Sequence, residues 1–319
     1  MIGSPRDVDV VCTDGDRQLQ RVASPARSAI VGPWGWRAVS FGSIVGLTLI
    51  IFRGPIIRLV QLASQQDEYS HVITIPVICA WLFVRERRRI FSSVQTCWLP
   101  GLGMLSASGL LYWLAGRYVE SASGNDQLSI AIFAVVLLCI GCFILCYGLA
   151  ALTRSVFPLL FLFLIVPMPE ILLSRVIFWL QSGSAEVSDA MFQMLSVPVF
   201  RTGFTFFLPG ISIEIARECS GIRSSVAMLI VSLLAGHLFL RSPWTKALLT
   251  LTTLPLLVIK NGIRIVTLTL LSVHLDRSFL TGNLHHRGGI VFFVLALGLL
   301  AALLWSLQRL EQSTGIESV

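Results

Sequence analysis

Several side chains with nucleophilic or acid–base chemistry stand at the edges of apolar runs in this sequence. They are Cys219 in "ECSGIRSS", Arg264 in "NGIRIV", and His285 and His286 in "HHRGG". A cysteine reacts as its thiolate, which a neighbouring cation stabilises, and a histidine exchanges protons near neutral pH. An arginine can hold the oxyanion of a tetrahedral intermediate. Together these groups suggest acyl transfer from a peptide bond through a thioester on the cysteine.

The apolar runs between these residues must position them. The 319 residues are 55% hydrophobic and 13% charged, with a mean hydropathy of +0.81, whereas soluble domains carry about 25% charged residues. Runs of about 20 apolar residues cross a bilayer as helices. We therefore expect an all-α polytopic membrane protein. Its net charge of +7 comes from basic residues beside the apolar runs, which indicates membrane orientation and not nucleic-acid binding.

About eight transmembrane helices are expected, with both termini in the cytoplasm. Their approximate ranges are 38–60, 71–84, 99–116, 128–150, the short run "VFPLLFLFLIVPMP", 220–240, 247–273 and 288–306. The stretch "RERRR" after the second span assigns its loop to the cytoplasm, because Lys and Arg concentrate on that side. We thus expect a cytoplasmic tail over residues 1–37, a catalytic membrane domain over 38–307 and a short cytoplasmic tail over 308–319.

Two segments before the cysteine are predicted to lie at the outer surface. Residues 170–198 place apolar side chains near helical spacing among charged ones, which favours an amphipathic helix in the outer interface. Residues 199–217 combine glycine turns with β-branched and aromatic alternation, which favours a small hairpin. The hairpin leads directly to Cys219.

Counting along the spans brings the chemistry-bearing residues to one side of the membrane. Cys219 begins a span on the outside, and the two histidines precede another span on the same side. Arg264 lies about 27 Å along its helix from the cytoplasmic Lys246, at ~1.5 Å per residue. Ionisable residues inside spans are costly and mark functional sites by default, although a lone arginine also reaches the interface by extending its side chain.

At these residues the chain resembles the exosortase/archaeosortase family of membrane sortase-like cysteine transpeptidases, over about residues 38–307. The similar stretches are "ECSGIRSS", "NGIRIV", "HHRGGIVFF", "EYSHVITIPVICAWLFVRERRRI" and "FLIVPMP". The resemblance implies that Cys219 is the nucleophile and Arg264 the catalytic arginine. His285 fits the third role because Gly289 stands four residues after it, and His286 is the second choice.

The chain departs from the family pattern at two positions. Ile290 stands where the family often has tryptophan, and Lys260 is unusual beside the motif asparagine. Neither is one of the three reactive positions, but both leave the subfamily open.

The resemblance also implies a substrate class. The expected partners are exported proteins with a C-terminal sorting signal of the PEP-CTERM type, made of a short motif, a transmembrane helix and a basic end. The enzyme is expected in the bacterial inner membrane, with its active site on the periplasmic side. It would pass the acyl group to an unknown acceptor, and no cofactor or metal ion is expected.

Four further residues receive supporting roles. Asn261 is expected to hydrogen-bond across helices and to help place Arg264. Arg223 is an alternative source of positive charge for the thiolate. Glu218 orients Arg223 or His285, or is a plain solvated carboxylate. His71 lies near the substrate or forms a structural hydrogen bond at the interface.

Two readings of a different class remain open. A polytopic transporter would use Lys260 and Arg264, four residues apart on one helix face, as an anion-binding pair. It would have little use for Cys219, and no inverted repeat is apparent. The other alternative is a non-catalytic assembly factor for exopolysaccharide or envelope export.

Overall fold

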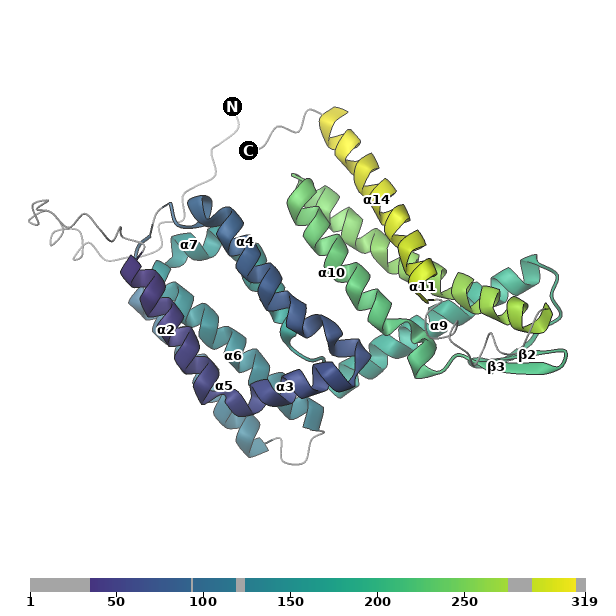
Figure 1. Ribbon diagram of the computed structural model, residues 1–319, viewed down its shortest axis with the longest axis horizontal. Helices are drawn as coiled ribbons and strands as arrows, with labels where there is room; N and C mark the ends of the chain where they lie inside the picture. Colours follow the sequence, from purple (N-terminus) through teal and green to yellow (C-terminus); the bar gives the residue numbers. More distant parts are fainter. Residues whose placement is uncertain (1–34, 93, 119–123, 275–288, 314–319) are drawn as a thin grey trace, which may run out of the picture. The chain divides into compact units, whose positions relative to one another are not determined.

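The computed structural model of the chain describes residues 35–92, 94–118, 124–274 and 289–313, apart from the side chains of Asp67, Tyr118, Glu218 and Cys219. The described chain is helical except for one small sheet (Figure 1). It divides into two units, which are described separately. Unit 1 comprises residues 1–58, 76–122 and 130–166, and unit 2 comprises residues 59–75, 123–129 and 167–319.

Unit 1 is built from helices that pack around aromatic side chains. Phe143 of α6 (Gly124–Tyr147) is buried, and its ring lies 5.0–6.2 Å from those of Phe41, Phe83, Phe91 and Tyr147. The other helices with residues in this unit are α2 (Gly35–Ile51), α3 (Arg53–Gln65), α4 (Thr74–Ile90), α5 (Trp98–Tyr118), α7 (Leu149–Arg154), α8 (Val156–Leu162) and η3 (Phe163–Ile165).

The first predicted span, residues 38–60, is two helices and not one. α2 and α3 meet at Phe52 with a bend of 77°. Pro55 follows the break, and a proline lacks the N–H that would bond to the carbonyl four residues earlier. The "RGP" sequence at residues 53–55 thus accounts for the bend.

Unit 2 is organised around one long helix, α11 (Pro243–His274). Helices α9 (Glu170–Met194), α10 (Ile222–Phe239) and α14 (Gly289–Ser313) all pack against it (Figure 1). The shorter elements of this unit are η2 (Asp67–Ile73), β1 (Phe200–Thr202), β2 (Thr205–Leu208), β3 (Ile211–Glu214) and η4 (Arg217–Ser220). The helix expected over 170–198 is therefore present as α9, while its place at the membrane interface stays a prediction.

A buried carboxylate closes the first turn of α11. Glu311 of α14 accepts hydrogen bonds from the backbone N–H groups of Arg241 and Ser242, at 3.0 and 2.8 Å, and from the Thr245 hydroxyl at 2.5 Å. The first N–H groups of a helix have no partner within it, and they carry partial positive charge that a carboxylate complements. This contact joins α14 to the start of α11.

The small sheet contains three antiparallel strands in the order β1-β2-β3. The sequence predicts one hairpin here, and the structure has two in succession, with tight turns at Gly203 and Gly210 in positive-φ conformations. One face carries Phe206, Leu208 and Ile215, which pack with Phe192 of α9 and Val266 of α11. Beyond Ile215 the chain enters η4.

Four described helices, α6, α10, α11 and α14, are long and apolar enough to cross a membrane. The number rises to six if each of two bent pairs, α2–α3 and α8/η3–α9, forms one span. The expectation of eight is thus not supported. The helices at the second and third predicted spans fall short because α4 has only 17 residues and ends in three arginines, and α5 mixes apolar residues with glycine and serine.

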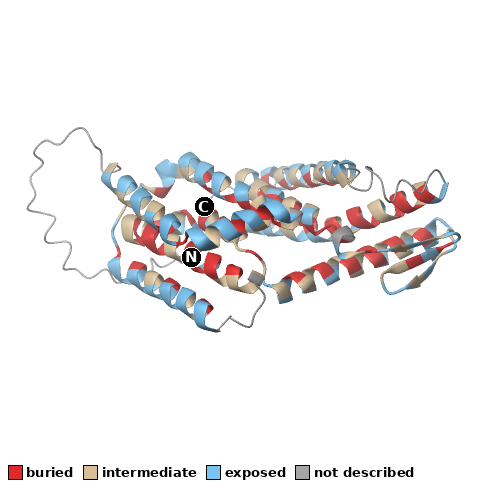
Figure 2. Ribbon diagram, turned by 60° about the horizontal axis from the view of Figure 1, so that its bottom comes forward, coloured by how far each residue is buried: buried red, intermediate tan, exposed pale blue. Residues whose placement is uncertain are grey.

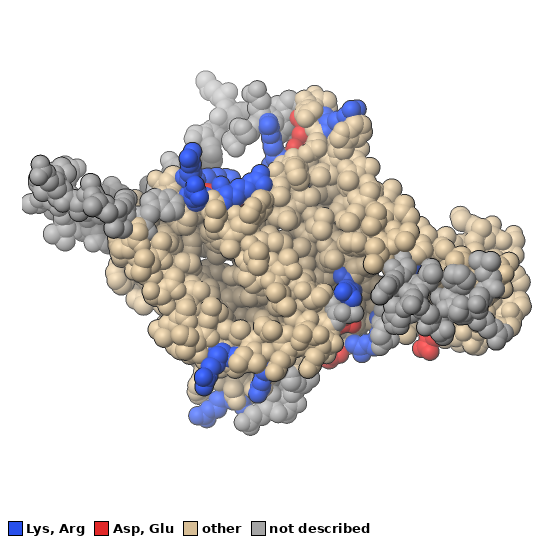
Figure 3. Space-filling view, in the orientation of Figure 1, with Lys and Arg blue, Asp and Glu red and all other residues tan. Residues whose placement is uncertain are grey.

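The surface of the helices suits a lipid environment. Residues on α14 such as Ile290, Val294 and Leu299 are 57–64% exposed, and Figure 2 shows exposed positions along the described helices. On the face drawn in Figure 3, charged side chains are sparse and uncharged ones cover most of the described surface. Large exposed apolar surfaces mark contact with a partner or a membrane, and the chain is a membrane protein.

Candidate functional site

The backbone of Cys219 lies in a tight turn at the start of a membrane helix. The turn is η4, and Gly221 follows it with φ of 77°, a left-handed conformation that suits glycine. Helix α10 begins at the next residue, and its first N–H donates to the Ser220 hydroxyl at 3.4 Å. The cysteine backbone is therefore held just before the N-terminus of α10, where the helix dipole favours negative charge.

Asn261 of α11 packs directly against this turn. A Cβ atom added to Gly221 would lie 3.0 Å from Asn261 Oδ1, so only glycine leaves this space free. Asn261 is buried, and its Nδ2 donates to the Ser184 hydroxyl of α9 at 3.0 Å. The expected hydrogen bond across helices is thus present. This α11 side chain contacts both α9 and the turn that carries Cys219.

Lys260 makes a second connection between α11 and the same region. Its ammonium group donates to the Ser224 hydroxyl in the first turn of α10, and Ser224 Oγ in turn donates to the Gly221 carbonyl at 3.0 Å. Lys260 is only 7% exposed. A buried ammonium inside a membrane helix is costly, and here it is placed beside the cysteine-bearing turn.

Helices α9 and α11, which carry these contacts, pack closely against each other. A Cβ atom on Gly262 would lie 2.5 Å from the Val187 side chain, and one on Gly183 would lie 2.9 Å from Val258. Each glycine therefore admits a valine of the opposite helix. Small residues allow membrane helices to approach closely in this way.

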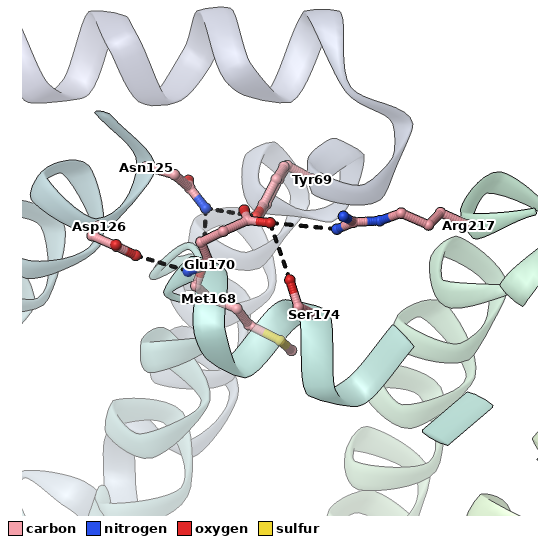
Figure 4. A network of polar contacts seen from close by, with 7 residues as sticks. All are labelled: Tyr69, Asn125, Asp126, Met168, Glu170, Ser174 and Arg217. Carbon is pink, nitrogen blue, oxygen red and sulfur yellow. Dashed lines mark hydrogen bonds and ion pairs between the residues drawn. The ribbon is translucent and has the colours of Figure 1, made fainter. Parts of the chain in front are cut away.

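The segment before Cys219 is also anchored. Gln181 of α9 donates through Nε2 to the Ile215 carbonyl at 2.7 Å, and the Ile215 N–H donates to the Phe204 carbonyl at 3.0 Å. Two residues before the cysteine, Arg217 forms an ion pair with Glu170 of α9 at 3.4 Å (Figure 4). Backbone and side-chain contacts thus hold the turn from both of its ends.

Glu170 belongs to a wider polar network within unit 2 (Figure 4). Its backbone N–H donates to Asp126 Oδ1 at 2.7 Å, and its carboxylate accepts from the Ser174 hydroxyl at 3.2 Å. Asn125 donates to the Met168 carbonyl at 3.0 Å and to the Tyr69 hydroxyl at 3.4 Å. Burial raises the pKa of Tyr69, against the opposite effect of the Asn125 hydrogen bond.

The network therefore ties four separate segments to the start of α9. They are η2, the first turn of α6, the stretch before α9 and the cysteine-bearing turn.

The structure describes some of the other predicted site residues and not others. Arg264 is half-buried on α11, one helical turn beyond Lys260, and Arg223 is exposed in the first turn of α10. His71 lies in η2, which packs against α10. The side chains of Cys219 and Glu218, and all of His285 and His286, lie outside the described residues, so the roles expected of them stay predictions.

Several contacts around the turn were not singled out from the sequence. They involve Gln181, Ser184, Ser224, Glu170 and Arg217. The available signal was the presence of polar residues in otherwise apolar helices, which face protein interiors or cavities in membranes. In the described part of the chain, no three His, Cys, Asp or Glu side chains are grouped so that they could hold a metal ion.

Helix α11, which carries Arg264, thus packs through Asn261 on the turn that carries Cys219. Comparison with known proteins gives a family of membrane enzymes. Residues 63–302 match the family described as transmembrane exosortase (Exosortase_EpsH), a range that contains both residues and the network of Figure 4. No curated protein and no solved structure matches the chain. Since the family match covers most of its length, the chain belongs to the transmembrane exosortase family.

Proposed function

We propose that this exosortase, a membrane enzyme of protein sorting, cleaves C-terminal sorting signals of exported proteins through a thioester on Cys219. The observation that supports it most is the packing of Asn261 against Gly221. It joins the helix with the Asn-x-x-Arg motif to the turn with the cysteine, although these two motifs lie some forty residues apart in the sequence.

The proposed reaction has two halves. His285, or His286 in its place, takes the proton of the Cys219 thiol, and the thiolate attacks the carbonyl carbon of the scissile peptide bond. Arg264 holds the resulting oxyanion through its N–H donors and its positive charge. The histidine then protonates the leaving amine as the C–N bond breaks, which leaves an acyl thioester.

The second half releases the product. Water or an acceptor nucleophile gives its proton to the histidine and attacks the thioester carbonyl, and the C–S bond breaks to restore the thiolate. The acceptor belongs to the cell envelope in this proposal, and the active site faces the periplasm from the inner membrane. The substrate's own transmembrane helix keeps the scissile bond at the level of the turn.

The test is co-expression with a reporter that carries a PEP-CTERM-type sorting signal. Cys219→Ala and Arg264→Ala are expected to abolish processing, and His285→Ala to reduce it severely. Cys142→Ala is the matched control, because Cys142 is buried in α6 of unit 1 and is expected to contribute only packing. Processing that survives in Cys219→Ala would refute the thioester mechanism.

The orientation has its own measurement. A membrane-impermeant thiol reagent is expected to label Cys219 in spheroplasts from the outside, and not in inside-out vesicles. The reverse pattern would place the site on the cytoplasmic side.

A further inference from the structure

Among the residues that the structure describes, strand β3 has one edge without a strand partner, a few residues before the cysteine. Within the described chain it pairs only with β2, because the strand order is β1-β2-β3. Its last residue is Glu214, five positions before Cys219. Five residues span at most about 17 Å, so a peptide aligned with β3 ends close to the cysteine turn.

The hydrogen-bonding phase of β3 determines which backbone groups face this edge. The Ile215 N–H bonds to the Phe204 carbonyl of the neighbouring segment, and Ile213 is paired with Phe206. Residues of an antiparallel strand alternate between bonding to the partner and pointing away from it. The N–H and C=O groups of Ser212 and Glu214 therefore point outward, and both side chains are exposed.

The other edge of the sheet is less suited to a substrate. The outward backbone groups of β1 belong to Arg201, because Phe200 and Thr202 are the residues in phase with β2. The Arg201 side chain is engaged with Glu186 at 2.9 Å and lies over the Phe206 ring. In addition, β1 lies 17 or more residues before Cys219 and does not lead into its turn.

We infer that the free edge of β3 binds the extended segment of the sorting signal as an added β-strand, an inference that rests on the proposed function. Addition of a peptide to a sheet edge supplies main-chain hydrogen bonds that do not depend on side-chain identity. It also covers an edge that is otherwise a template for aggregation.

The direction of the added strand follows from the chain order on both sides. β3 runs toward η4 and then into α10, a helix long and apolar enough to cross the membrane. The sorting signal likewise runs from an extended segment into a transmembrane helix. Both chains then approach the membrane in the same direction, so the added strand is parallel to β3.

Parallel pairing makes a specific prediction of contacts. One substrate residue, here called X, is bracketed by Ser212 and Glu214: its N–H donates to the Ser212 carbonyl, and its C=O accepts from the Glu214 N–H. The N–H of the residue two positions after X donates to the Glu214 carbonyl. The residue between them directs its backbone groups away from the enzyme.

The test replaces single backbone amides of the substrate by esters, which removes one N–H at a time. The probe is a synthetic peptide with an extended segment, an apolar helix of about 20 residues and an arginine-rich end, presented to the full-length enzyme in proteoliposomes. Esters at X and two positions later are expected to raise KM about five- to tenfold, and the ester between them to raise it much less, because it removes no bonded N–H and only makes the X carbonyl a weaker acceptor. Effects without this two-residue alternation would overturn the inference.

A matched pair of enzyme variants tests the other partner of the same bonds. Glu214→Pro removes the outward N–H and is expected to raise KM about tenfold with little change in kcat. Glu214→Ala keeps the N–H and is expected to raise KM far less than Glu214→Pro does. Equal KM values for the two folded variants would contradict the inference, and the ester series decides the matter if Glu214→Pro does not fold.

The outcome is separable from that of the proposed function. Processing that depends on Cys219 but shows no ester alternation removes only the role of β3. Processing of the same peptide by Cys219→Ala removes the proposed function itself.

Discussion

The interiors of the two units use different side chains. In unit 1 the rings of Phe41, Phe83, Phe91 and Tyr147 surround Phe143. In unit 2 the helices are joined through buried polar groups as well as through apolar contacts such as those of Phe192 and Val266. Among the described residues, every buried side chain that is charged or carries an amide lies there, namely Gln181, Lys260, Asn261 and Glu311.

This difference suggests that the interior of unit 1 serves stability and that the buried polar contacts of unit 2 serve the reaction. Aromatic side chains fill space and need no partner, whereas a polar group buried in a membrane protein is costly unless it is hydrogen-bonded. Three of these four side chains, Gln181, Lys260 and Asn261, contact residues within five positions of Cys219. We therefore expect damage to unit 1 to lower stability, and damage to these contacts to lower the rate of processing.

The largest expected effect is on the stability of unit 1. Phe143→Ala leaves a cavity among aromatic rings, and large-to-small substitutions of this type cost about 3–5 kcal/mol of unfolding free energy. Denaturant titration in mixed micelles measures it, with Phe133→Ala as control because Phe133 is 38% exposed. Processing per folded molecule is expected to stay unchanged, and a specific loss of kcat would break the proposed separation.

The next effect concerns the close approach of α9 and α11. Gly262→Ala places a methyl group against Val187 and is expected to lower stability by about 1–3 kcal/mol, as overpacking does, and to lower the processing rate as well. The double variant Gly262→Ala/Val187→Ala makes room for the methyl group and is expected to recover both. Failure of Val187→Ala to rescue would show that the Gly262 position matters for another reason.

A smaller effect is expected for a substitution of Lys260. Unlike the two substitutions above, it is not expected to lower stability. Lys260→Met keeps the side-chain length but removes the buried ammonium, so the melting temperature is expected to rise or stay constant. Processing is expected to fall about tenfold, since about 1.4 kcal/mol of transition-state stabilisation is lost when the turn is less well held.

Two further variants are compared with Lys260→Met. Lys246→Met, on the same helix, is expected to have no effect on processing. Ser224→Ala is expected to reproduce part of the loss, because it removes the hydroxyl between Lys260 and Gly221. A Lys260→Met enzyme that is less stable but fully active would assign Lys260 to packing alone.

The smallest effect is expected at the partly exposed ion pair of Figure 4. Arg217 and Glu170 are 55% and 44% exposed, and such pairs contribute about 0–1 kcal/mol. Arg217→Gln is expected to reduce processing a few-fold, more at low salt than at high salt, because salt screens the parent pair. A loss as large as that of Cys219→Ala would mean that Arg217 contacts the substrate or the reacting atoms.

The helices of unit 2 could be predicted well from apolar runs alone. The spans expected at 220–240, 247–273 and 288–306 correspond to α10, α11 and α14 within a few residues, except that α14 extends to Ser313. Long apolar runs bounded by basic or glycine-containing loops define such helices. The packing of α9 against α11 is carried by Gly183, Gly262 and Ser184, small residues that leave no mark on a hydropathy pattern.

Other features escaped because the local sequence favours more than one structure. The apolar pattern of α9 predicts a buried face that includes Leu180 and Val187. In the structure the buried face includes the polar residues Gln181, Ser184 and Ser188. β1 has only three residues, too few for an alternation to be recognised. The roles of Cys219, Arg264 and His285 came from motif resemblance, and they stay predictions until the variants above are measured.

The carboxylate of Glu311 has a consequence for biosynthesis. The first turn of α11, the helix that carries Arg264, is completed by a side chain that is translated 70 residues after Arg241. Until α14 has entered the membrane, the amides at this end must be satisfied by water or lipid headgroups. Maturation of the enzyme is therefore expected to be a late event in its synthesis, and a ribosome-bound chain that stops before Glu311 should remain accessible to proteases at the α10–α11 loop.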